Sequence, residues 1–163
     1  TVSPNGQYIA AGSRDGVLEI WLGHETRFWR AEEAHRGNFI KAMLVQYVPT
    51  TGFINTLSFS ADSEMLASGG ADKSICIRYV YEKATIHVIE EAHDSKPLNC
   101  LYSKYFNFQA TVLCVRFPPK GNFMCSASKD PTLKVWRISD FTLYAVIPEA
   151  HKGNLTYRFA ADL

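Results

Sequence analysis

The amino-acid sequence predicts an all-β fold built from repeated units of four short antiparallel strands. Three observations lead to this prediction: an internal repeat, apolar residues that alternate with a period of two, and turn-forming residues at the same place in every repeat. No long stretch of the sequence shows the helical period of 3.6 residues. The chain has 163 residues, which is enough for one domain with its own core.

The internal repeat runs through most of the chain. Its three copies align at residues 2–21, 59–78 and 117–136. Two kinds of anchor residue recur at intervals of 57 or 58 positions: Asp15, Asp72 and Asp130, and then His35, His93 and His151. An interval this constant is typical of similar structural units arranged in a row.

Each copy has the pattern of two short strands joined by a tight turn. Alternating apolar residues flank the sequences "SRDG", "GADK" and "SKDP", in which the Asp side chain can bond the backbone of its own turn. A third strand is expected before the copy, as in "INTLSFS" and "TVLCVRF", and a fourth before each "EAH". Each unit therefore contains four antiparallel strands.

The composition limits the classes of function. A formal net charge of +1 does not indicate the excess of basic residues that is typical of proteins that bind nucleic acid. No apolar run approaches the roughly 18–20 residues that cross a bilayer, and no signal-peptide pattern is present. The four cysteines match no zinc motif, so we expect free thiols, no metal and no cofactor. These features favour an intracellular location, cytoplasmic or nuclear.

The pattern of anchor residues resembles the WD-repeat (beta-transducin-like) family. A His before the first strand, an Asp in the second turn and a Trp six residues later carry the resemblance, best seen in His93, Asp130 and Trp136. The segment "DGVLEIW", which ends at Trp21, repeats part of it. The resemblance implies a partial β-propeller made of four-stranded WD-type blades.

The predicted organisation is a single partial domain over residues 1–163. We expect a blade remnant, two blades and the start of a further repeat, at 1–34, 35–92, 93–150 and 151–163. The opening "TVSPNG" favours a fragment of a longer protein, so the remainder of the propeller would be needed to close the ring.

The resemblance also implies a hydrogen-bonded network of His, Ser, Asp and Trp within a blade. The expected members are His93, Ser126, Asp130 and Trp136 in the third unit, His35, Ser68 and Asp72 in the second, and Asp15 and Trp21 in the first. Arg78 stands where the second unit should have Trp, and the serine could instead lie two residues later, at Ser13 or Ser128. Recurring His, Ser and Asp could suggest a hydrolase, but three copies at one interval favour a structural role.

The function implied by the resemblance is a non-enzymatic scaffold that binds proteins or peptides within a larger assembly. Candidate partner-binding residues lie near the expected loops: Arg14, Arg36, Lys73 and Lys129. No nucleic-acid or membrane partner is expected. The alternative is an accessory propeller of a larger enzyme.

The interval of 58 residues is longer than the roughly 40–45 of a WD repeat, so each of two blades contains an insert of about 15 residues. The inserts lie at about 38–52 and 96–110 and share no sequence. They could be partner-binding loops, or extra strand-forming segments that place aromatic residues on a partner surface.

A third interpretation comes from the genetic code. The dipeptides at 37–38, 95–96 and 153–154 can each be encoded with the GTAA of a splice donor, directly after an "EAH". Removing both inserts restores an interval of about 43 residues. We favour this hypothesis, in which the chain is a translated stretch of unspliced gene with no independent function. A spliced transcript that lacks the codons near 38–52 and 96–110 would support it, and a transcript that retains them would exclude it.

Overall fold

The computed structural model describes residues 1–23, 26–31, 52–93, 110–119 and 122–150. The strands of this part of the chain form three antiparallel sheets. The first sheet has the order β1-β2-β3, with strands Tyr8–Gly12, Leu18–Leu22 and Thr26–Ala31. The second has the order β4-β5-β6-β7, with strands Ile54–Phe59, Met65–Gly70, Ile75–Tyr79 and Thr85–Ile89. The third has the order β8-β9-β10-β11, with strands Val112–Arg116, Phe123–Ser128, Leu133–Arg137 and Leu143–Ile147.

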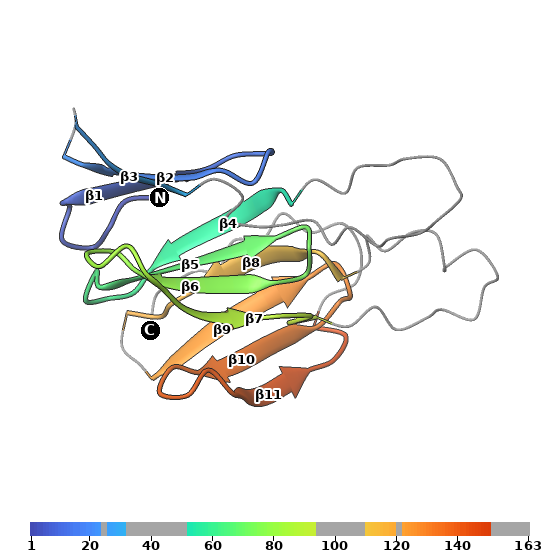
Figure 1. Cartoon of the computed structure of the whole chain (residues 1–163). Coiled ribbons are helices and arrows are strands. Elements are labelled where there is room, and N and C mark those ends of the chain that lie inside the picture. Colours follow the sequence, from blue (N-terminus) through green and yellow to red (C-terminus); the bar gives the residue numbers. More distant parts are fainter. Residues whose placement is uncertain (24–25, 32–51, 94–109, 120–121, 151–163) are drawn as a thin grey trace, which may run out of the picture.

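The three sheets are stacked in the order of the sequence (Figure 1). The prediction of an all-β fold with four-stranded antiparallel units is confirmed for the second and third sheets. The first sheet shows three strands in the described residues, which correspond to the last three strands of the other two. No helix in the described ranges is long and apolar enough to cross a membrane.

Apolar side chains fill the space between successive sheets. The leading face of each sheet is the face turned toward the next sheet, and the trailing face is the opposite one. One cluster joins Leu18 and Ile20 on the leading face of the first sheet to Leu66 of the second. A second cluster joins Ile75 and Ile77 on the leading face of the second sheet to residues of the third that include Val112, Met124 and Trp136. Because strand residues alternate between faces, the period-two pattern of the sequence supplies both apolar faces of a unit.

Glycine lets the first strand of the next sheet approach closely. Gly12 pairs with Leu18, and Gly69 holds the same register opposite Ile75. A Cβ atom at Gly12 would lie 2.5 Å from Cγ2 of Ile54, and one at Gly69 would lie 2.5 Å from Cγ1 of Val112. A side chain at either position would therefore force the two neighbouring sheets apart.

Polar side chains of β4 hydrogen-bond the backbone of β8 and of Phe117, the residue that follows it. The Asn55 Nδ2 group donates to the Val112 carbonyl at 3.0 Å. The Thr56 hydroxyl accepts from the Val115 amide at 3.1 Å, and the Ser58 hydroxyl accepts from the Phe117 amide at 3.1 Å. These bonds satisfy backbone groups at the edge of the third sheet and hold the first strands of two sheets together.

The predicted inserts lie almost wholly outside the described residues, so their interpretation and the domain boundaries stay predictions. The described chain resumes at equivalent places in both units. The Phe53 carbonyl accepts from the Ala71 amide at 2.8 Å, and the Thr111 carbonyl accepts from the Lys129 amide at 3.1 Å. Both sheets therefore begin just after the predicted ends of the inserts.

Candidate functional site

The site is built on the turns that join β1 to β2, β5 to β6 and β9 to β10, and we call this end of the sheets the Asp-turn end. In the third sheet, Asp130 Oδ1 accepts from the Thr132 amide at 2.9 Å and from the Thr132 hydroxyl at 2.7 Å. In the second sheet, Asp72 Oδ1 accepts from the Ser74 amide at 3.1 Å and from the Ser74 hydroxyl at 2.8 Å. These bonds fix the conformation of each turn.

His93 is the centre of a buried network on the third sheet. Its Nδ1 atom lies 3.1 Å from Oδ2 of Asp130 and 3.0 Å from the Thr132 hydroxyl. Its Nε2 atom lies 2.8 Å from the Ser126 hydroxyl, which also accepts from the Trp136 Nε1–H group at 2.8 Å. The side chains of His93 and Ser126 are fully buried.

The donors and acceptors of this network match if His93 carries its proton on Nδ1. The Trp136 indole then donates to Ser126, Ser126 donates to Nε2, and Nδ1–H donates to the Asp130 carboxylate. Burial would by itself raise the pKa of Asp130, but the hydrogen bonds from His93 and Thr132 outweigh it and hold that pKa below its ordinary value. Every polar atom of the imidazole is satisfied without exposure to water.

Two further contacts hold His93 between the second and third sheets. The amide of the preceding residue, Ala92, donates to the Lys73 carbonyl in the Asp turn of the second sheet at 2.9 Å. The Ala92 carbonyl accepts from the buried Lys134 Nζ group of β10 at 2.8 Å. The segment that leaves β7 is therefore bonded to both sheets, and the network links two neighbouring units.

The second sheet has a different arrangement around the equivalent serine. Ser68 is fully buried, and its hydroxyl accepts from Nη1 of Arg78 at 3.4 Å. Arg78 therefore contacts Ser68 as Trp136 contacts Ser126, although a guanidinium replaces the indole. His35, the predicted third member, lies outside the described residues.

The first sheet does not bring its predicted residues into one buried cluster. Ala11 has the register of Ser68 and Ser126, and it is exposed. Asp15 is exposed and bonds the Ser13 hydroxyl within its turn, whereas Trp21 lies half-buried on β2. In the third sheet, Ser128 accepts from the Asp130 amide, so Ser126 and not Ser128 is the serine that His93 contacts.

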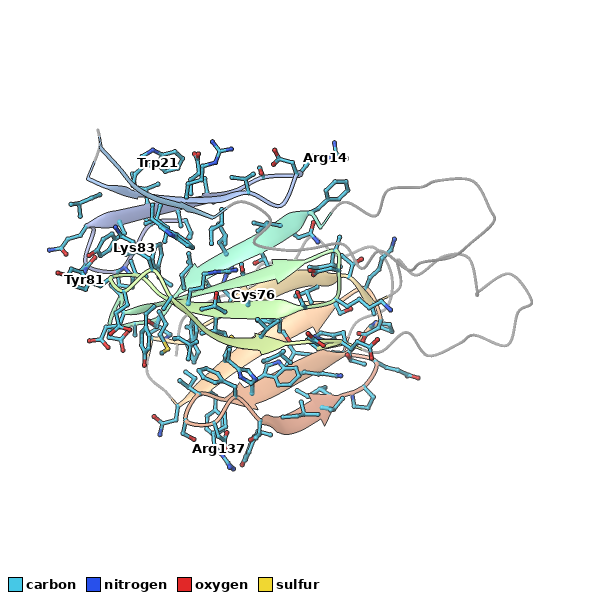
Figure 2. All side chains as sticks on the ribbon, in the orientation of Figure 1. Arg14, Trp21, Cys76, Tyr81, Lys83 and Arg137 are labelled. Carbon is cyan, nitrogen blue, oxygen red and sulfur yellow. The ribbon has the colours of Figure 1, made fainter. Side chains whose placement is uncertain are left out.

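Three of the four candidate partner-binding residues lie at the Asp-turn end. Arg14 is exposed, and its guanidinium carbon lies 5.1 Å from the centre of the Phe53 ring. Lys73 is partly exposed in a left-handed conformation with φ of 69°, and Lys129 is exposed. Figure 2 shows Arg14 at this end of the sheets and Lys83 at the opposite end. Arg36 lies outside the described residues.

Two members of the network were not predicted from the sequence. Thr132 and Lys134 contact His93 and Ala92, respectively. Thr132 could have been found, because a Ser or Thr stands two residues after Asp72 and again after Asp130. Lys134 has no such signal, since Cys76 and Glu19 hold the same register in the other sheets.

The cysteines on β8 and β9 have the low reactivity of protonated thiols. Cys114 and Cys125 are free thiols, as expected. Burial raises the pKa of both Cys114 and Cys125, which keeps these thiols protonated near neutral pH. In the part of the chain that the structure describes, no group of His, Cys, Asp or Glu residues could hold a metal ion.

Stacked four-stranded sheets linked by a buried His–Asp–Ser–Trp network define a WD-repeat propeller unit. The family model for "WD domain, G-beta repeat" matches residues 1–21, 42–78 and 98–137, so the chain belongs to this family. The last two ranges include part of each predicted insert.

Similar proteins include WD-repeat and HIR1 proteins. "Protein hir1" of Schizosaccharomyces pombe is 32% identical over 89% of this chain and 14% of its own length. "Protein HIR1" of Cryptococcus neoformans is 29% identical over 88% of this chain and 14% of its own length. "WD repeat and HMG-box DNA-binding protein 1" of Xenopus laevis is 31% identical over 61% of this chain and 8% of its own length. The chain thus spans a small part of the relatives it matches.

The same fold is present in a solved structure of the RRP9 WD40 repeats. That structure matches with a TM-score of 0.67 and 16% sequence identity, over 91% of this chain and 37% of the solved one. The likeness extends to the arrangement of the sheets, which form part of a propeller.

The pKa of Asp130 leads to a prediction about acid stability. A carboxyl group with a lowered pKa in the folded state stabilises the fold above its ordinary pKa of about 3.9, and this contribution is lost as the pH falls through the lower folded value. We expect Asp130→Asn to be less stable than the wild type at neutral pH. The difference should shrink as the pH falls below about 4. Urea unfolding of both proteins at a series of pH values measures this difference in stability. A difference that does not change with pH would contradict the lowered pKa of Asp130 in the folded state.

The indole N–H of Trp136 is expected to contribute less than the imidazole. Trp136→Phe keeps an aromatic ring but removes the donor to Ser126, which should cost about 1 kcal/mol of unfolding free energy. Trp21→Phe is the matched control, because Ala11 replaces the serine in the first sheet. If chemical denaturation showed that both variants lose the same unfolding free energy, the hydrogen bond to Ser126 would contribute nothing to stability.

Proposed function

We propose that this chain is a non-enzymatic scaffold that binds other proteins, with the Asp-turn end as the docking surface. Membership of the WD-repeat family supports a role in protein interaction. The main observation in support of the proposal is that hydrogen bonds fix the turns that form this surface. The turn of Lys129 is fixed by the Asp130 bonds, and the turn of Lys73 by the Asp72 bonds and the Ala92 amide. A pre-organised surface loses little entropy when a partner binds.

The geometry around His93 resembles a hydrolase triad, but its burial supports a structural role. Ser126 contacts Nε2 and Asp130 contacts Nδ1, as a nucleophile and an orienting carboxylate would. Ser126 is fully buried, and its hydroxyl already binds the Trp136 indole. A substrate would have no route to this oxygen without separating the sheets. We therefore assign the network to fold stability and no catalytic step to these residues.

We infer an intracellular location, in the cytoplasm or the nucleus, and a role within a larger assembly. The buried free thiol at Cys114 supports a reducing compartment. One relative is named a DNA-binding protein, but the net charge of +1 offers no comparable support for nucleic acid here.

Charge reversal at the two ends of the sheets tests the docking surface. The double variant Arg14→Glu/Lys129→Glu alters the Asp-turn end, and Lys83→Glu/Arg137→Glu alters the opposite end, where Figure 2 shows both residues. Tagged chains would be purified from the source cells and their bound proteins quantified against an unrelated tagged protein. We expect a defined set of bound proteins that is lost with the first variant and kept with the second.

Two results would count against the proposal. Equal binding by both variants would place the docking surface elsewhere. The absence of any protein enriched over the unrelated control would contradict the scaffold role itself.

A further inference from the structure

We draw no further inference here: the strongest candidate, the patch formed by Tyr79 at the end of β6 and Tyr81 in the turn between β6 and β7, stays 40% and 78% exposed on a sheet that has a neighbouring sheet on each side, but nothing in the structure shows what covers it.

Discussion

Replacing His93 with alanine is expected to lower the free energy of unfolding by about 3 kcal/mol, because buried groups that lose a hydrogen-bond partner cost roughly 1–3 kcal/mol each. The imidazole contacts Asp130 and Thr132 through Nδ1 and Ser126 through Nε2, and all of these groups lie on the third sheet. Its removal leaves the Asp130 carboxylate partly desolvated without its strongest donor. It also breaks one link between the segment after β7 and the third sheet. Urea denaturation followed by far-ultraviolet circular dichroism measures the loss.

His87→Ala is the matched control for this experiment. His87 lies exposed on β7 and stacks on Phe141 with the ring centres 5.2 Å apart. A stacked pair of this kind contributes on the order of 1 kcal/mol, so the loss should be clearly smaller. If the two variants lost the same stability, the buried network would have no special role in holding the sheets together.

Replacing Gly69 with alanine is expected to cost about 2 kcal/mol, because extra atoms in a well-packed interior typically cost about 1–3 kcal/mol. An added Cβ atom would lie 2.5 Å from Cγ1 of Val112, 2.9 Å from Cγ2 of Thr56 and 3.0 Å from Cγ2 of Val115. Val112 and Val115 belong to β8, so the methyl group would push the second and third sheets apart. The hydrogen bond from the Val115 amide to Thr56 would be strained by the same movement.

The third sheet provides the control for this substitution. Ala127 holds the register of Gly69, opposite Leu133. Ala127→Gly removes a buried methyl group and also gives the unfolded chain more freedom, so it should cost about 1–2 kcal/mol without any clash between the sheets. Thermal and urea unfolding of both variants would be compared with the wild type. A Gly69→Ala variant as stable as the wild type would show that the two sheets do not pack this closely.

Much of the fold could be predicted because its determinants are local. The alternation in "SICIRY" and "LKVWRI" produces two-faced strands, and the Asp of each turn bonds a residue two positions away. Register follows from these short turns, since a shift by one residue would expose Ile75 and Ile77. The family resemblance then pointed to His93, Ser126, Asp130 and Trp136, which the structure brings together.

Other parts of the site depend on contacts between residues far apart in the sequence. No pattern in the sequence assigns Lys134 to the Ala92 carbonyl, because the two residues meet only when the third sheet packs on the second. The contact of Arg78 with Ser68 also had no local signal, since a charged residue at a Trp position would ordinarily be expected at the surface. The roles of Arg14, Lys73 and Lys129 stay predictions, although the structure shows where these residues lie.

The sequence by itself determined the strands, their turns and the two-faced character of every sheet, because hydrogen bonds and side-chain alternation within some twenty residues decide them. Only the tertiary structure decided that His93 links two sheets and that Gly69 is a point of close approach. These features arise from the stacking of units whose equivalent residues are 57 or 58 positions apart. Which side chains are buried depends on how the sheets stack, so it cannot be predicted from the sequence of any one strand.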